Sequence, residues 1–375
     1  MQDILQRAVE AGVVPFAAAA RVTADGITAT AASGGAGPDT IFRMASMTKA
    51  VTSVAVMQLV EQGRIDLDAP AATYLERIRD AQVLDGFDAD GTPRLRAPCS
   101  APTTRQLLTH TAGFSYAIWN EDMQRMAAYL GMDAAAGIDE TILDLPMVAD
   151  PGTCWEYGTN TDLLGVMLEA VTGRSLAEHL VEHLFEPLGM SDTHFNVPAQ
   201  KQSRVLPVFS RTDEGLVAVM QGIAQVRFFS GGGGLASTLV DYARFLQMLL
   251  RGGELDGRRI LAPETVALMA GNHTGALPIP PMRTAYPFLT ADCDFFPGQP
   301  KHWGLGFLIN AADVPGCRRA GSLTWAGVFN THYWIDRRAG FAGMLLTQLL
   351  PFCDPAFLEL YADVERALYQ GAATA

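Results

Sequence analysis

Lysine is scarce in this sequence. Of 27 basic residues only three are lysines, namely Lys49, Lys201 and Lys301, so arginine is the ordinary cation of the chain. Arginine keeps its proton under all physiological conditions and cannot act as a base. A lysine that lies close in sequence to a nucleophilic residue is therefore informative, and Lys49 follows Ser46 by three positions.

Long apolar runs are absent. No stretch approaches the ~20 consecutive apolar residues of a membrane-spanning helix. The first ten residues, MQDILQRAVE, have the pattern of an amphipathic helix and lack the continuous apolar core of a signal peptide. We therefore expect no membrane interaction and a cytoplasmic location.

Cysteine is sparse and shows no pairing pattern. The five cysteines are odd in number, contain no Cys-x-x-Cys pair, and are Cys99, Cys154, Cys293, Cys317 and Cys353. Such a set is more typical of reduced thiols than of a disulfide framework. We expect all five to be reduced.

The charge balance excludes one class of partner. The formal net charge is −13 and the pI is near 4.9. Proteins that bind phosphate backbones present clustered Lys and Arg, so we expect no nucleic-acid partner.

The order of predicted elements gives the domain organisation. At 375 residues and 49% hydrophobic content the chain can bury a large core. A β-hairpin is predicted at 16–22 and 27–32, and an antiparallel meander at 304–310, 318–324, 328–335 and 341–349, followed by a helix at 356–368. The fold class is therefore α/β in the α+β sense. Residues 1–65 and 230–375 should together form a sheet domain, built from both chain ends. Residues 66–229 should form a mainly helical domain with few strands. The catalytic cleft should lie between the two domains.

Residues 46–63 are predicted to form a buried helix that carries the chemistry. Apolar residues recur at near-helical spacing, and Gly63 is a plausible C-terminal stop. Residues three apart share a helix face, so Lys49 should present its amine beside the Ser46 hydroxyl. A serine becomes a useful nucleophile when a neighbour takes its proton, and a buried lysine can be that neighbour.

Three other motifs offer competing readings. His179-Leu-Val-Glu-His183 matches an inverted zinc-protease pattern, but both histidines fall off the apolar face of their helix, so we expect a solvated polar surface and no metal. His110 lacks a Gly-x-Ser-x-Gly elbow to serve as triad partner and is expected to be structural. The glycine run 230–234 lacks the Walker lysine, so we expect it to allow close backbone packing, with no nucleotide cofactor.

Several motifs together resemble one superfamily. Ser46-x-x-Lys49, a loop ending in Tyr157, and Trp325-Ala326-Gly327 on a strand occur in the order found in serine β-lactamases and penicillin-binding proteins. The sequence is most similar to their esterase branch, the family VIII carboxylesterases related to class C β-lactamases. The similarity extends over nearly the whole chain and includes 107–113, 186–190 and 331–336.

The resemblance implies a fold and a set of roles. The fold would be β-lactamase/transpeptidase-like, an antiparallel sheet flanked by helices with an inserted helical domain. Ser46 would be acylated, with Lys49 and Tyr157 as the proton-transfer pair. The backbone N–H groups of Ser46 and Val328 would form the oxyanion hole.

Two departures from the family pattern concern the substrate. Trp325 stands where β-lactamases and transpeptidases carry a lysine that binds the substrate carboxylate. Thr159 stands where many members have an asparagine that holds a substrate amide, with Asn160 one position later. Both changes favour small, largely uncharged esters over β-lactams and peptides.

The sequence therefore predicts a serine carboxylesterase without metal or cofactor, whose only expected partner is a small-molecule ester. An acyltransferase, a weak β-lactamase or D-amino-acid peptidase, and a catalytically idle binding protein are the alternatives, and the oligomeric state is open. The residues expected to bind substrate are Tyr116, Trp119, Thr159, Phe229, Trp325, Ala326 and Gly327.

Overall fold

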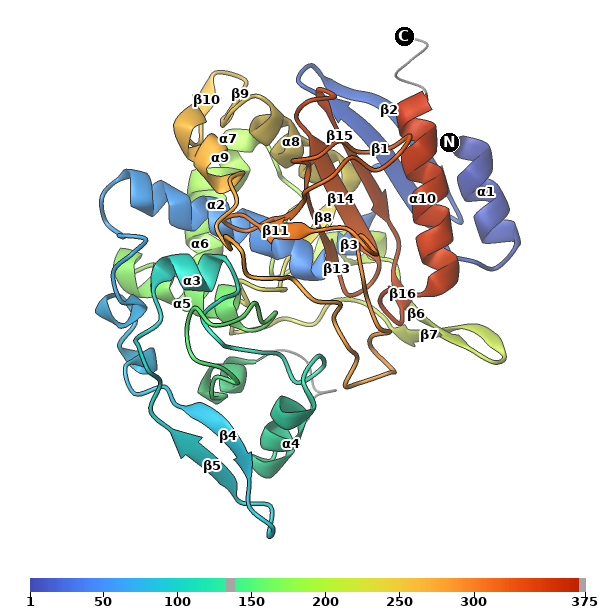
Figure 1. The fold of residues 1–375 in the computed structure, drawn as a ribbon. Helices are drawn as coiled ribbons and strands as arrows, with labels where there is room; N and C mark the ends of the chain where they lie inside the picture. Colours follow the sequence, from blue (N-terminus) through green and yellow to red (C-terminus); the bar gives the residue numbers. More distant parts are fainter. Residues whose placement is uncertain (133–138, 371–375) are drawn as a thin grey trace.

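A computed structural model describes residues 1–132 and 139–370, and its centre is a seven-stranded sheet (Figure 1). The strand order is β11-β12-β13-β14-β15-β1-β2, and every neighbouring pair is antiparallel. The strands are β1 (Ala17–Thr23), β2 (Gly26–Ser33), β11 (Lys301–Trp303), β12 (Leu308–Asn310), β13 (Leu323–Gly327), β14 (Thr331–Asp336) and β15 (Phe341–Leu346). Because β1 pairs with β15, the sheet joins both ends of the chain, as the sequence predicts.

Alternation along β1 explains how helices cover both faces of this sheet. Successive strand residues point to opposite faces. Ala17 and Ala19 lie in one apolar cluster with residues of α1 (Gln2–Glu10) and α10 (Pro355–Gln370), whereas Ala18 and Ala20 lie in the main core with residues of α8 (Leu239–Leu250). The alanine side chains are small enough for helices to pack closely on both sides. Figure 1 shows α1 and α10 side by side at one edge of the molecule.

The predicted serine helix is present and deeply buried. A short turn of 3-10 helix, η1 (Ala45–Met47), leads into α2 (Thr48–Glu61). Nearly every residue of α2 is buried, including the polar side chains of Thr48, Lys49, Thr52 and Ser53. The helix is entered from β3 (Ile41–Arg43), which pairs with β8 (Ala236–Thr238). Gly63 follows the helix with a left-handed φ of 67°.

Residues 66–229 contain more strand than the sequence suggests. Two hairpins occur there, β4 (Val83–Phe87) with β5 (Pro93–Arg96), and β6 (Val208–Thr212) with β7 (Gly215–Met220). β6 also pairs in parallel with β16 (Leu349–Leu350), which follows the main sheet. β5 (PRLR) and β7 (GLVAVM) are largely exposed, and neither sequence alternates apolar and polar residues in the way that reveals a half-buried strand.

The remaining helices and short strands surround these elements. They are α3 (Thr104–Leu108), α4 (Glu121–Tyr129), α5 (Asn160–Thr172), α6 (Leu176–Leu180), the π-helical turn η5 (Val181–Phe185), α7 (Glu186–Leu188), α9 (Pro263–Met269), η2 (Ala71–Thr73), η3 (Glu76–Ile78), η4 (Glu140–Asp144), η6 (Ala199–Arg204), β9 (Glu254–Leu255) and β10 (Arg258–Arg259). Among the described residues, no helix has both the length and the apolar character needed to cross a bilayer.

The predicted meander is correct in order, but its first two strands are placed differently. The first, predicted at 304–310, is only β12 (Leu308–Asn310), and β11 (Lys301–Trp303) before it was not predicted. The second strand is shifted. The sequence places that strand at 318–324, whereas β13 spans Leu323–Gly327. Arg318 is instead fully buried in an ion pair with Glu365 of α10, at 2.8 Å, and Gly321 turns the chain with a φ of 85°. The shift brings the Trp-Ala-Gly motif to the end of a central strand.

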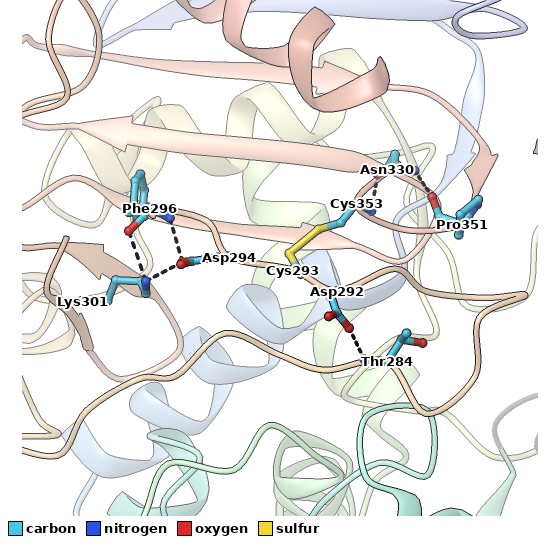
Figure 2. The surroundings of a disulfide bond; sticks show 9 residues. All are labelled: Thr284, Asp292, Cys293, Asp294, Phe296, Lys301, Asn330, Pro351 and Cys353. Carbon is cyan, nitrogen blue, oxygen red and sulfur yellow. Dashed lines mark hydrogen bonds and ion pairs between the residues drawn. A yellow bond between two sulfur atoms is a disulfide. The ribbon is translucent and has the colours of Figure 1, made fainter. Parts of the chain in front are cut away.

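The expectation of five reduced cysteines is wrong for two of them. Cys293 and Cys353 form a disulfide with a Cα–Cα distance of 5.8 Å, drawn in Figure 2. Cys293 lies in the long irregular segment after α9, and Cys353 lies just before α10, where its N–H donates to Asn330 Oδ1. The 60 residues that separate the pair conceal it in the sequence. Cys99, Cys154 and Cys317 are free thiols.

Candidate active site

Ser46 lies in a strained turn at the entrance of α2. Ala45 adopts a φ of 45°, which non-glycine residues rarely do and which occurs mostly at functional sites. Ser46 itself is only partly buried, whereas both of its neighbours are buried. The turn therefore presents the hydroxyl while the backbone around it is held in the core.

Lys49 is 1% exposed, and its amine has three hydrogen-bonding partners. Nζ lies 3.3 Å from Ser46 Oγ, 3.1 Å from the Tyr116 hydroxyl and 2.7 Å from the Gly232 carbonyl oxygen. The amine and the serine hydroxyl thus lie side by side one helical turn apart. All three hydrogen-bonding directions of the amine are occupied.

Tyr116 connects this amine to a buried carboxylate. Its hydroxyl donates to Asp162 Oδ2 over 2.5 Å. Asp162 is fully buried in the first turn of α5, and its Oδ1 accepts from the Ser230 hydroxyl at 2.5 Å and from the Gly232 N–H at 3.0 Å. Burial and the Asp162 charge raise the pKa of Tyr116 well above its usual value. Tyr116 is therefore a neutral phenol.

Tyr157 lies next to both the amine and Tyr116, and the two tyrosine ring centres are 5.6 Å apart. Its ring centre is 4.8 Å from Lys49 Nζ, and its hydroxyl accepts a 3.0 Å hydrogen bond from Trp325 Nε1. The following residue, Gly158, packs so closely on the backbone of residues 114–115 that a side chain there would clash. This packing fixes the loop that carries Tyr157 beside the loop that carries Tyr116.

The backbone beside Ser46 comes from β13. Gly327 ends this strand, and a Cβ atom there would overlap with the Met44 carbonyl oxygen and Thr331 Oγ1 and would lie 3.1 Å from Ala45 Cβ. Because Gly327 has no side chain, the strand end lies directly against the turn that carries Ser46. Val328 is the next residue, so its backbone enters the same neighbourhood.

The other motif residues have structural partners. Thr159 is 1% exposed, and Asn160 is fully buried and donates to the Phe114 carbonyl oxygen at 3.1 Å and contacts His110 Nδ1 at 3.0 Å. Burial, followed by the Lys49 charge, lowers the pKa of His110 well below its usual value. His110 is thus a neutral histidine packed against Tyr157, which agrees with a structural role.

A cavity of about 180 Å³ opens beside Tyr157. Its wall mixes aromatic and apolar side chains with one acid, one amide and one arginine. It is lined by Trp119, Asn120, Trp155, Glu156, Tyr157, Pro280, Pro281, Met282 and Arg283. Burial raises the pKa of Glu156, whose carboxylate accepts from the Ser115 hydroxyl at 2.6 Å.

The aromatic residues expected in the pocket separate into three places. Trp119 lines the cavity, and Trp325 is 2% exposed behind it between Tyr157 and Trp303. Phe229 instead packs against Phe195, with ring centres 5.2 Å apart. Tyr116 contacts the lysine.

The glycine run 230–234 packs closely, as the sequence predicts. Gly231 leaves no room for a side chain beside the Thr161 carbonyl oxygen, and its own carbonyl oxygen accepts from Thr52 Oγ1 at 2.8 Å. A side chain at Gly232 would overlap with Tyr116 and Asp162. The run thus lets backbone reach the lysine and the buried acid.

The histidine motif has no metal geometry. His179 is 3% exposed, so the expected solvated surface is wrong for this residue, whereas His183 is partly exposed. His179 follows Leu176 by three positions in α6, so the two side chains share the buried face of this helix. Within residues 1–132 and 139–370, no group of three or more potential ligands could hold a metal ion.

Sequence reasoning missed several residues around the site. Asp162 looks like an ordinary acid in the first turn of a helix, where it favours the helix dipole. Residues 280–283 lie in an irregular segment without a motif. The available signals were indirect: Asp162 is followed by the apolar run that starts at Leu163, and the proline pair at 280–281 indicates a rigid wall.

A serine hydroxyl and a lysine amine on one buried helix, placed against the end of an antiparallel strand, define a serine hydrolase of the β-lactamase and penicillin-binding-protein class. The chain belongs to the Beta-lactamase family, whose model matches residues 1–367. Within this family it is a serine enzyme of the hydrolase and acyltransferase type, and the predicted fold is confirmed.

Characterised relatives include both transferases and a hydrolase. The chain is 31% identical to ML-236A carboxylate methylbutanoyltransferase of Penicillium citrinum, over 88% of this chain and 81% of the relative. It is 30% identical to lovastatin esterase of Penicillium rubens, over 88% and 84%. A mutant of simvastatin synthase from Aspergillus terreus superimposes with a TM-score of 0.84 at 29% identity, covering 99% of this chain and 94% of the other.

Proposed function

We propose that this chain is a serine carboxylesterase that hydrolyses small, largely uncharged esters through an acyl-enzyme on Ser46. The observation that carries this proposal is the 3.3 Å contact between Lys49 Nζ and Ser46 Oγ at a partly exposed turn. The 30% identity to a lovastatin esterase supports the choice of ester chemistry.

In the first half-reaction, the Ser46 Oγ–H bond breaks and the proton moves to the Lys49 amine. Oγ forms a bond to the ester carbonyl carbon, and the carbonyl electron pair moves onto its oxygen. That oxyanion accepts hydrogen bonds from the backbone N–H groups of Ser46 and Val328, each typically worth about 3 kcal/mol in the transition state. The close packing of Gly327 supports this role for Val328.

The collapse of the tetrahedral intermediate completes acylation. The bond to the leaving alkoxide breaks, and the alkoxide takes up the proton that Lys49 received from Ser46, with Tyr157 as the second member of the proposed proton-transfer pair. In the second half, water gives a proton to the same pair and attacks the acyl carbon, and Ser46 leaves and regains its proton. The Trp325 N–H fixes the Tyr157 oxygen in this scheme.

The surroundings of Trp325 support an uncharged acyl substrate. The indole is packed among aromatic rings, and its N–H is already bonded to Tyr157. It therefore offers no positive charge to a substrate carboxylate at this position. β-Lactams, which carry such a carboxylate, should be poor substrates.

A second candidate function is acyl transfer to an alcohol. The cavity beside Tyr157 favours it, because its wall can offer an acceptor alcohol apolar contacts from residues such as Trp119 and Met282 together with polar contacts. The similarity to a methylbutanoyltransferase supports the same reading. The two functions share the acyl-enzyme and differ only in the acceptor.

One experiment tests both functions. The protein is incubated with short-chain p-nitrophenyl esters, with and without a bulky apolar secondary alcohol, and the products are separated by mass spectrometry. Free acid formed at the same rate in both conditions supports an esterase, whereas a new ester that replaces the acid supports a transferase. Absence of p-nitrophenol release and of an acyl adduct on Ser46 would contradict both.

A further inference from the structure

The partners of Lys49 restrict how its amine can be oriented. A neutral amine has two N–H donors and one lone pair. The Gly232 carbonyl oxygen, at 2.7 Å, can only accept a hydrogen bond. If the Tyr116 hydroxyl also accepts, both N–H donors are used, and the lone pair must point toward Ser46 Oγ.

Whether Tyr116 accepts depends on where its own proton lies. Asp162 Oδ2 is 2.5 Å from the phenol oxygen, and an ionised carboxylate can only accept. The single proton of Tyr116 is therefore committed to Asp162. Burial and the Asp162 charge raise the pKa of the phenol, so this proton is kept.

Asp162 is itself held in one orientation. The Ser230 hydroxyl and the Gly232 N–H donate to its other oxygen, and the carboxylate is fully buried. Gly232 therefore contacts both ends of the arrangement, because its N–H binds Asp162 and its carbonyl oxygen binds Lys49. A side chain at Gly232 would overlap with Asp162 and Tyr116.

We propose that Asp162, acting through Tyr116, is a positioning residue that fixes the rotation of the Lys49 amine so that its lone pair faces the Ser46 hydroxyl. The inference rests on the proposed role of Lys49 as base. The Asp162 carboxylate also stabilises the ammonium that forms when Lys49 takes the serine proton. This is the role that an aspartate plays toward histidine in a Ser-His-Asp triad.

The other groups that face the Lys49 amine do not supply this negative charge. The Tyr157 ring lies 4.8 Å away and its hydroxyl is bonded to Trp325. His110 is fully buried and is a neutral imidazole. Asp162 is thus the carboxylate to which the amine is linked, through one hydroxyl.

The test is the pH dependence of kcat/KM in Asp162→Asn and Tyr116→Phe. Either change removes stabilisation of the ammonium, so the ascending limb should move to lower pH by roughly one unit. The plateau should fall by roughly 10–100-fold, because the amine loses its fixed rotation. Asp162→Asn added to Tyr116→Phe should have little further effect, because the carboxylate acts through the phenol.

Ser230→Ala is the matched control. It removes a hydrogen bond to the same carboxylate but leaves the charge and the link to Tyr116, so the ascending limb should stay in place. A purely structural role for Asp162 predicts that Ser230→Ala and Asp162→Asn both lower the plateau without moving the limb.

The outcomes separate this inference from the proposed function. If Tyr116→Phe folds but its limb does not move, while Ser46→Ala abolishes acyl-adduct formation, the positioning role is overturned and the esterase proposal stands. If Ser46→Ala still turns over, both are overturned. If Asp162→Asn fails to fold, Tyr116→Phe alone decides the question.

Discussion

The indole N–H of Trp325 donates to the hydroxyl oxygen of Tyr157 over 3.0 Å. Trp325→Phe removes this donor but keeps an aromatic ring, so Tyr157 should lose its fixed orientation. One hydrogen bond of about 1.4 kcal/mol corresponds to roughly a tenfold loss in kcat/KM, measured by ester hydrolysis.

Trp303→Phe is the control for this change. Trp303 is also a buried indole next to Trp325, but its N–H donates to the Leu108 carbonyl oxygen. It should lower the midpoint of thermal unfolding with a smaller effect on kcat/KM. An equal loss of kcat/KM in both variants would assign the effect to packing.

Ser46→Ala should abolish turnover and the acyl adduct seen by intact-mass spectrometry, because no oxygen remains to bond the acyl carbon. The free energy of unfolding should change little, since Ser46 is only partly buried. Ser53→Ala provides the comparison, as Ser53 is a buried serine on the same helix. An adduct that persists in Ser46→Ala would place the nucleophile elsewhere.

Gly327→Ala should impair catalysis through backbone displacement. The new Cβ would overlap with the Met44 carbonyl oxygen and Thr331 Oγ1, so the strand end must move away from Ser46. Loss of one oxyanion donor costs roughly 10²–10³-fold in kcat, which single-turnover kinetics would measure. Gly37→Ala is the control, because a Cβ atom at Gly37 would lie 3.4 Å or more from every neighbouring atom and the residue has no left-handed φ.

The disulfide between Cys293 and Cys353 can be tested by counting free thiols. Alkylation of the unfolded protein without reductant should modify three cysteines, and five after reduction. Because the bridge spans 60 residues, its removal should lower the free energy of unfolding by roughly 4 kcal/mol. The Cys293→Ser/Cys353→Ser double variant should be insensitive to dithiothreitol. Five reactive thiols before reduction would contradict the bridge.

The partly buried carboxyl group of Glu156 should make the stability of the protein depend on pH. Burial raises its pKa in the folded state, so the folded protein binds its proton more tightly than the unfolded chain. Glu156 therefore contributes to the stability of the folded protein at pH values below the ordinary glutamate pKa. This contribution is lost as the pH rises through the raised pKa that Glu156 has in the folded state. Glu156→Gln should therefore flatten the decline in urea midpoint over this window, whereas Glu359→Gln, at an exposed position, should not.

Features that depend on residues close together in the sequence could be predicted. The Ser46 and Lys49 pair follows from helical spacing, and the strands at both chain ends follow from alternation, because each signal lies within a few residues. Tyr157 came from resemblance, since nothing local distinguishes it from other tyrosines in loops.

Contacts between residues far apart in the sequence could not be predicted. Asp162 and Tyr116 are 46 residues apart and meet only because a glycine run leaves room for both. Cys293 and Cys353 likewise meet only through tertiary folding. A local pattern reports the preference of one segment, whereas these contacts depend on several segments packing at once.

The pairing of β1 with β15 affects how the protein is made. The register joins Ala18 to Leu346, so during synthesis the first hairpin leaves the ribosome long before its neighbour exists. Until then an unpaired strand edge is open to other chains. Ser46 is translated early, but the strand end that supports it arrives late. Nascent chains that end before β15 should therefore be inactive, and activity should appear only after Phe341–Leu346 has been translated.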